Sequence, residues 1–190
     1  MTTQVNIEKT YSVDEFMDLV AGRNDARFEL VKGKLIEMSL AGDQHGRISA
    51  KLLILLGYYV LQNDLGQTYG SDTGFVLDET DPKKPTVRGP DVAFTTKERL
   101  SKVNTKAVPI PPDLAVEVMS PNDYSPETLE KVREYQQAGV RLIWIIRPKT
   151  QTVEVYRQYD KQPTTLTIED ELDGEQIIKG FMLKVKVLFS

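Results

Sequence analysis

The chain has 190 residues, with 24 Lys and Arg against 28 Asp and Glu, one histidine and no cysteine. Without cysteine there can be no disulfide, thiolate zinc site, iron–sulfur cluster or cysteine nucleophile, and a single histidine excludes a multi-histidine metal site within one chain. Any metal chemistry must therefore use mainly carboxylates, which favours hard ions such as Mg²⁺ or Mn²⁺.

The composition is that of an ordinary globular domain. Hydrophobic residues make up 40% of the chain and charged residues 27%, and the length predicts one domain over residues 1–190. No apolar run is long enough to span a bilayer, and residues 1–10 lack the basic start and apolar core of a signal peptide, so we expect a cytoplasmic location and no membrane partner. The net charge of −4 weakens the expectation of nonspecific nucleic-acid binding without excluding a local basic patch.

Two helices and a hairpin are predicted in the first third of the chain. Ser12 as N-cap and Glu15 three residues later form a capping-box pattern, and apolar residues then recur at helical spacing. Residues 28–31 and 34–38 flank a two-residue turn that ends in glycine, which predicts a β-hairpin. Residues 44–62 predict a long helix with one broad buried face.

The remainder of the chain predicts mainly strands. The strand-like segments are 67–69, 74–77, 91–94, 113–119, 142–146, 153–156, 165–168 and 183–188. Residues 126–137 predict a helix that ends at Gly139, and the proline-containing stretches 78–89 and 101–112 predict loops. This order of elements indicates a mixed α/β (α+β) domain around a central sheet.

Glu117 lies in the middle of an apolar strand. Strand alternation over residues 113–119 places Glu117 on the same face as Ala115 and Met119. An ionised carboxylate buried alone costs several kcal/mol unless it is paired, protonated or bound to a cation. Two interpretations stay open at this point: a pair with a nearby Lys or Arg, or a functional carboxylate.

A second carboxylate strengthens the functional interpretation. Asp91 follows Pro90 at the entrance of a predicted strand, on the face opposite Val92 and Phe94. Alone it is typical of a turn or strand-cap residue. If this strand neighbours the strand of Glu117, the two backbones lie about 4.8 Å apart, and both carboxylates could share one divalent ion.

The helix predicted over residues 126–137 offers a cation. Leu129, Val132 and Ala138 are predicted to mark its inner side, and Lys131 and Tyr135, four residues apart, to lie side by side on its flank. The alternative is that Lys131 pairs with Glu127 on a solvated face.

The best candidate for a DNA-binding patch comprises four basic residues close together in sequence. They are Lys97, Arg99, Lys102 and Lys106, with Glu98 as the one acid among them. Such a run is more often a solvated loop or helix face.

Six runs, in this order and spacing, resemble the Uma2 family of restriction-endonuclease-like proteins, which is abundant in cyanobacteria and was formerly a domain of unknown function, DUF820. The runs are 11–16, 28–38, 70–75, 90–94, 117–121 and 131–140, and the match is collinear from Tyr11 to about Phe189. The resemblance implies the PD-(D/E)XK nuclease fold, a mixed sheet flanked by helices, with Mg²⁺-dependent (or Mn²⁺-dependent) hydrolysis of DNA.

The family motif maps onto individual residues. Pro90-Asp91 resembles the PD and Glu117 resembles the (D/E), whereas Met119 stands where the motif has Lys. Lys131 matches a lysine that the family carries in the following helix. By the same resemblance, Glu29 corresponds to an upstream acidic residue of the site and His45 to a family histidine.

The roles that the resemblance implies fit phosphodiester chemistry. Asp91 and Glu117 are the expected metal ligands, with Glu29 as a direct or water-mediated third, because a metal must polarise the phosphoryl oxygen and activate a water. Lys131 would orient the nucleophile or stabilise developing charge. His45 is either a hydrogen-bonding residue at a helix start or a proton shuttle.

The resemblance, supported by the carboxylate pattern, therefore implies a Mg²⁺-dependent DNA endonuclease. The alternative is a non-catalytic, oligomeric binding or regulatory module that retains the fold, and Met119 keeps this alternative open. By analogy, cutting both strands would be easiest for a homodimer. A hydrolase with His45 as triad base lacks a nucleophile-elbow pattern such as G-x-S-x-G.

Overall fold

The structure is a computed structural model that describes residues 9–23, 26–100, 106–120 and 125–190. Its helices are α1 (Val13–Ala21), α2 (Asp43–Gln62), α3 (Ser125–Ala138) and α4 (Lys186–Phe189), and a 3-10 turn, η1, covers Lys97–Arg99. Its strands are β1 (Arg27–Val31), β2 (Lys34–Met38), β3 (Gly66–Gly70), β4 (Phe75–Asp78), β5 (Thr86–Arg88), β6 (Val92–Thr96), β7 (Leu114–Val118), β8 (Leu142–Arg147), β9 (Thr152–Arg157), β10 (Thr164–Leu166), β11 (Glu171–Asp173) and β12 (Met182–Lys184).

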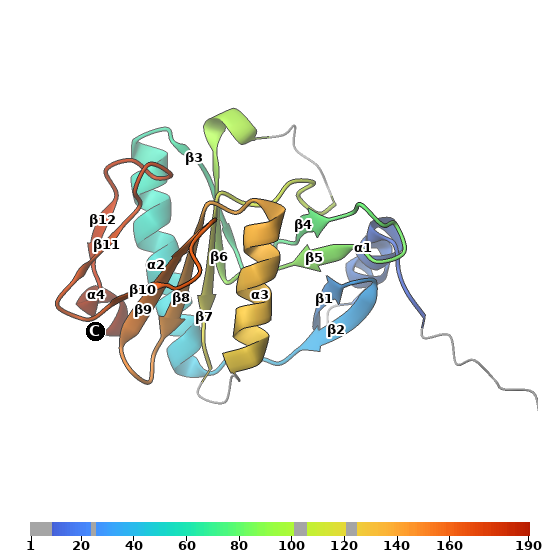
Figure 1. Ribbon diagram of the computed structural model, residues 1–190, viewed down its shortest axis with the longest axis horizontal. Coiled ribbons are helices and arrows are strands. Elements are labelled where there is room, and N and C mark those ends of the chain that lie inside the picture. The colour runs from blue at the N-terminus through green and yellow to red at the C-terminus, as the bar shows by residue number, and fades with distance from the viewer. Residues whose placement is uncertain (1–8, 24–25, 101–105, 121–124) are drawn as a thin grey trace, which may run out of the picture.

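A six-stranded mixed sheet lies at the centre, in the order β10-β9-β8-β7-β6-β3, with β7 and β8 parallel. The two long helices, α2 and α3, cover its opposite faces (Figure 1). The predicted alternation of β7 is confirmed, because Leu114, Val116 and Val118 pack under α2 while Ala115 faces α3. Residues 142–146 of β8 are fully buried, as expected for a strand with both faces covered.

A smaller sheet, in the order β2-β1-β5-β4, packs beside the central one and carries α1 (Figure 1). The predicted capping box is present: the backbone N–H of Glu15 donates to the Ser12 hydroxyl, and the Glu15 carboxylate accepts from the backbone N–H of Ser12 at 2.9 Å. The hairpin β1–β2 turns at Lys32 and Gly33, both in the left-handed region with φ of 50° and 79°. These angles suit the right-handed twist of the flanking strands.

Three local predictions are wrong. The predicted loop 78–89 contains β5, which pairs with both β1 and β4; three residues are too few to show a period in the sequence. The predicted strand 183–188 is β12 followed by α4, since one helical turn buries both Val185 and Leu188. Leu129, predicted on the inner side of its helix, is 40% exposed, and the large ring of Tyr135 fills the interface instead.

Some predictions concern residues that the structure does not describe. Residues 1–8, which include most of the segment compared with a signal peptide, and residues 101–105 of the predicted loop 101–112 lie outside the described residues. Within the described part of the chain, no helix combines the length and the apolar character needed to cross a membrane.

Candidate active site

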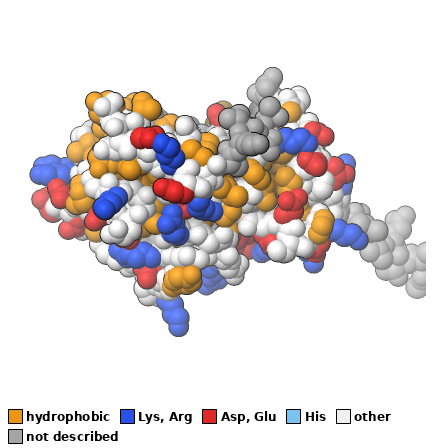
Figure 2. Space-filling view, turned by 90° about the horizontal axis from the view of Figure 1, so that it is seen from above, with side chains coloured by type: hydrophobic (Ala, Val, Ile, Leu, Met, Phe, Trp, Pro, Cys, Tyr) orange, Lys and Arg blue, Asp and Glu red, His pale blue; other side chains and the backbone are white. Residues whose placement is uncertain are grey.

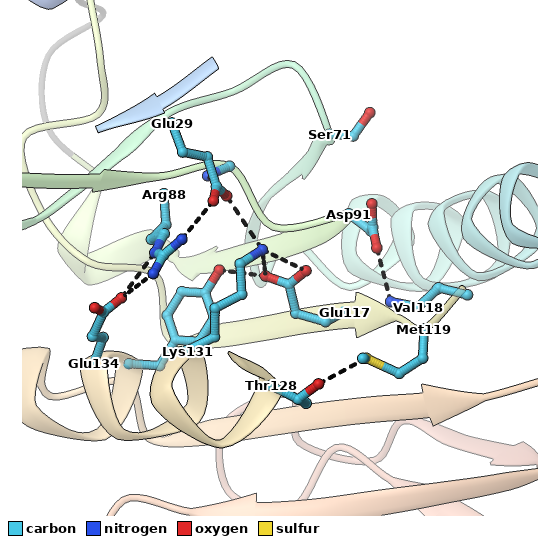
Figure 3. Close-up of polar contacts among 12 residues, drawn as sticks. Glu29, Ser71, Arg88, Asp91, Glu117, Val118, Met119, Thr128, Lys131 and Glu134 are labelled. Carbon is cyan, nitrogen blue, oxygen red and sulfur yellow. Dashed lines mark hydrogen bonds and ion pairs between the residues drawn. The ribbon is translucent and has the colours of Figure 1, made fainter. Parts of the chain in front are cut away.

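Strand β7 directs Glu117 toward α3, where it meets Lys131. The Lys131 Nζ lies 3.1 Å from each Glu117 carboxylate oxygen and 3.3 Å from Glu29 Oε1 (Figure 3). Only 17% of the Lys131 side chain is exposed. The structure therefore favours the inward-facing interpretation of Lys131 over a solvated pair with Glu127, and it brings together three of the predicted site residues.

Asp91 lies one residue before β6, and β6 pairs with β7, which meets the condition under which Asp91 and Glu117 could act together. Its Oδ2 accepts a hydrogen bond from the backbone N–H of Val118 at 2.8 Å (Figure 3). The Nε2 of His45, in the first turn of α2, lies 3.0 Å from the same oxygen. Asp91 is thus held between the central sheet and α2, and His45 has the hydrogen-bonding geometry that one of its two interpretations requires.

Glu29 is buried on β1 and is held by groups that the sequence analysis did not assign to the site. The Arg88 side chain, from β5, donates to Glu29 Oε2 at 2.7 Å, and the backbone N–H of Gly89 donates to Oε1 at 3.1 Å. Arg88 also donates to Glu134 of α3 at 2.6 and 2.8 Å. Arg88 therefore joins the smaller sheet to α3 through two buried ion pairs.

Tyr135 is a further residue whose role the sequence analysis missed. Its side chain is fully buried, and its hydroxyl donates to Glu117 Oε1 at 2.7 Å. The four-residue spacing of Lys131 and Tyr135 was the available signal, because it places both on one flank of α3. Met119, at the motif position of the missing lysine, accepts a long hydrogen bond of 3.8 Å on its sulfur from the Thr128 hydroxyl (Figure 3).

The ionisation of the cluster follows from burial and from its neighbours. Burial raises the pKa of Glu29, but the charges of Lys131 and Arg88 outweigh it, so the pKa lies below its ordinary value. Burial raises the pKa of Glu117, and the Asp91 and Glu29 charges add to this rise against the opposing effect of Lys131. Burial lowers the pKa of Lys131, yet Glu117 and Glu29 hold it above its ordinary value, so Lys131 is charged at neutral pH.

The cluster opens into a cavity of about 480 Å³ between the hairpin β1–β2, the start of α2 and α3. Glu29, Asp91, Glu117, Lys131 and His45 all contribute to its wall. Among the described residues, no set of three or more His, Cys, Asp or Glu side chains is spaced as a metal site. Lys131 lies between the Glu29 and Glu117 carboxylates and contacts both.

The predicted basic patch is largely neutralised where the structure describes it. Lys97 pairs with Asp64, Arg99 pairs with the buried Asp113, and Lys106 Nζ lies 2.7 Å from Asp14. The face that carries η1 accordingly shows acidic and basic side chains interspersed (Figure 2). Lys102 lies outside the described residues.

Comparisons with known proteins identify the family and the fold. The profile of the Uma2 family, described as "Putative restriction endonuclease", matches residues 13–186. A solved structure from Anabaena variabilis ATCC 29413, described as "a putative nuclease belonging to DUF820", superposes with a TM-score of 0.78 at 18% identity, over 94% of this chain and 97% of that chain. The likeness confirms the predicted restriction-endonuclease-like fold. No curated protein matches the chain.

Proposed function

Because the chain belongs to the Uma2 family, we propose that it is a metal-dependent DNA endonuclease whose active site is the cluster around Glu117. The observation that carries the proposal is the position of Lys131. Its ammonium contacts Glu117 and Glu29 in the same cavity that Asp91 lines. A lysine beside carboxylates suits metal-assisted phosphodiester hydrolysis, because carboxylates can hold the ion and an ammonium can stabilise the charge that develops on the phosphoryl group.

The carboxylate chemistry suits a hard divalent cation, although no three such side chains among the described residues are spaced as a metal site. Asp91 and Glu117 would hold Mg²⁺ or Mn²⁺, with Glu29 as a direct or water-mediated third ligand. Counted formally, the cluster holds four carboxylates (Glu29, Asp91, Glu117 and Glu134) against the two cations Arg88 and Lys131, a net charge of −2 with His45 neutral. A bound divalent ion would balance this charge, polarise a phosphoryl oxygen and lower the pKa of an attacking water.

The side chains around the ligands have distinct proposed tasks. Lys131 would orient the attacking water or stabilise the charge that develops on the phosphoryl group. Tyr135 holds one oxygen of Glu117, and the Val118 N–H together with His45 holds Asp91. These contacts limit the rotation of both carboxylates, which preserves their orientation toward the cavity.

Met119 is the observation that favours the alternative, a non-catalytic module. The motif position that usually carries lysine holds a thioether directed at Thr128. However, Lys131 of α3 supplies an ammonium to the Glu117 carboxylate from another element. We therefore place the nuclease first and treat the absence of cleavage as the result that would favour the alternative.

Cleavage of supercoiled plasmid DNA tests the proposal. With Mg²⁺ or Mn²⁺ the wild-type protein should nick or linearise the plasmid, and Asp91→Asn, Glu117→Gln or Lys131→Met should each slow cleavage by about 100-fold or more. Glu154→Gln is the matched control, because Glu154 is also a partly buried, ion-paired carboxylate of the central sheet but lies on β9 beside Arg147.

Three outcomes would contradict the proposal. Cleavage that persists in excess EDTA would exclude the metal. Equal cleavage by wild type, Asp91→Asn and Glu117→Gln would exclude this site. A folded wild-type protein that binds DNA but does not cut it with either metal would support the non-catalytic module.

A further inference from the structure

One wall of the active-site cavity is apolar. Strand β2 is the edge strand of the smaller sheet, and residues directly opposite each other in an antiparallel pair project from the same face. Ile36 is opposite Glu29 and Met38 is opposite Arg27, so both project into the cavity beside the carboxylate cluster. Leu40, two residues further along, also lines the cavity, where the chain passes from β2 to α2 (Figure 1). We call these three side chains the apolar strip.

The apolar strip is accessible from solvent. Ile36 is 41% and Leu40 97% exposed, and Met38 is partly buried. The other face of the hairpin is already occupied, because Leu35 packs against the apolar cluster under α1. Single exposed apolar side chains are ordinary, but three at alternate positions form a continuous surface. In a ligand cavity such a surface contacts the apolar part of the ligand, while a few polar groups fix its orientation.

The reacting groups lie in a recess. Asp91, Glu117 and Glu29 are almost fully buried, and the cavity volume of about 480 Å³ lies in the range of small-molecule sites. A metal ion held by these carboxylates would contact the scissile phosphate, so this phosphate must enter the cavity. Duplex DNA is stiff, with a persistence length of about 150 bp. An unpaired strand can bend and bring in a single nucleotide.

The charge of the cavity also disfavours a duplex. Its lining carries six carboxylates against three Lys and Arg side chains, and the acids at Glu37, Glu127 and Glu130 are exposed. Duplex binding depends on Lys and Arg side chains that neutralise many phosphates of both strands. One divalent ion in the cavity would offset the repulsion for one phosphate, which is what an entering single strand presents.

We propose that the cavity takes one nucleotide of an unpaired DNA strand, with its phosphate at the metal and its base against the apolar strip. This inference rests on the proposed nuclease function and names its substrate class. Aliphatic side chains can contact the flat face of a base, and every base has such a face. The preferred substrate is therefore single-stranded DNA, or an unpaired segment within a duplex, with little base preference.

Cleavage of one labelled oligonucleotide in three forms tests the substrate class. The forms are the single strand, the full duplex and a duplex with an internal unpaired loop. With Mn²⁺, wild type should cut the single strand and the loop at least about 10-fold faster than the duplex, because the duplex must first be unpaired. A negatively supercoiled plasmid should likewise be nicked faster than the same plasmid relaxed, since supercoiling favours strand separation.

Ile36→Ser tests the contact with the base. Fluorescence anisotropy with Ca²⁺, which takes the same oxygen ligands as Mn²⁺, should show single-strand affinity reduced about 10-fold, the low end for a lost apolar contact in a pocket. Mn²⁺ affinity should stay unchanged, which distinguishes a lost substrate contact from a collapsed site. Ile36→Leu should retain single-strand affinity. Ile54→Ser is the matched control, because Ile54 is also an exposed isoleucine but lies on α2 outside the cavity.

The outcomes separate this inference from the proposed function. Cleavage of the duplex as fast as the single strand would overturn the inference and leave the nuclease intact. Single-strand affinity that Ile36→Ser leaves unchanged would exclude the contact between base and apolar strip. If no DNA is cut, the nuclease proposal fails. A preference for binding the single strand that Ile36→Ser weakens would then still support the inference, and equal binding of both forms would overturn it.

Discussion

Replacing Lys131 with methionine would remove the ammonium that separates two buried carboxylates. The Glu117 and Glu29 side chains are only 11% and 3% exposed, and Lys131 contacts both. Methionine retains most of the volume of the lysine stem, so the loss would be mainly electrostatic. Glu29 would keep its ion pair with Arg88. Among the described residues, Glu117 would keep a hydrogen bond from the Tyr135 hydroxyl but no cation.

The expected loss of stability can be bounded. Removing one member of a buried ion pair costs about 3–5 kcal/mol. Glu117 can limit this cost by taking up a proton. Burial already raises the pKa of Glu117, and loss of the opposing Lys131 charge would raise it further, so protonation should keep the cost near the lower end of this range. We therefore expect Lys131→Met to lower the free energy of unfolding by about 3 kcal/mol at pH 7.

The pH dependence of this loss has a definite sign. In the variant the folded-state pKa of Glu117 lies further above its unfolded value, so the folded state binds more protons than the unfolded state between these two values. Stability then falls as pH rises through this interval, and it is recovered as pH falls toward the unfolded value. The difference from wild type should accordingly be smaller at about pH 5 than at pH 7.

Urea denaturation followed by circular dichroism, at both pH values, measures these differences. Adding Glu117→Gln to Lys131→Met should recover much of the loss at pH 7, because no charge then remains unpaired at Glu117. Lys32→Met is the control, since the Lys32–Glu130 pair is exposed, and it should leave stability nearly unchanged. A loss below about 1 kcal/mol for Lys131→Met, as for an exposed pair, would refute the reasoning.

Two further predictions concern hydrogen bonds to carboxylates. Tyr135→Phe keeps the buried ring but removes the hydrogen bond to Glu117. It should weaken Mn²⁺ binding about 10-fold in a calorimetric titration. Unchanged affinity would show that Tyr135 does not position Glu117. Burial raises the pKa of Asp113, but the Thr96 N–H, Arg99 and Arg141 outweigh it and hold the pKa below its ordinary value of 3.8. Asp113 therefore stabilises the fold above that value, and this contribution is lost as pH falls through the folded-state pKa. Asp113→Asn should flatten the acid side of the stability profile measured by urea unfolding, and an unaltered acid slope would count against the assignment.

Much of the site could be predicted because it depends on local patterns. The alternation of β7 places Glu117 on the face of Ala115. The pairing of β6 with β7, which brings Asp91 near Glu117, was a condition in the sequence analysis and is seen in the structure. The capping box at Ser12 is likewise a pattern within four residues. The inward position of Lys131 could not be predicted from helix spacing alone, because that spacing also allowed a solvated pair with Glu127. The family resemblance favoured the inward position.

The parts of the site that could not be predicted depend on contacts between segments far apart in the sequence. Arg88 meets Glu29 and Glu134 because β5 inserts between β1 and β4, and β5 is hidden in a proline-containing stretch. The basic run around Lys97 indicated a patch, yet its carboxylate partners, such as Asp64, come from other elements. No period within a single segment reports such pairings.

Asp91 and Glu117, with Glu29, are the proposed ligands of a divalent metal ion. Isothermal titration of Mn²⁺ into wild type, Asp91→Asn and the control Glu154→Gln tests this assignment most directly, independently of any substrate. We predict a saturable site in wild type and Glu154→Gln that is lost, or weakened at least about 10-fold, in Asp91→Asn. The absence of a saturable site in wild type, or equal affinity in Asp91→Asn, would contradict the account.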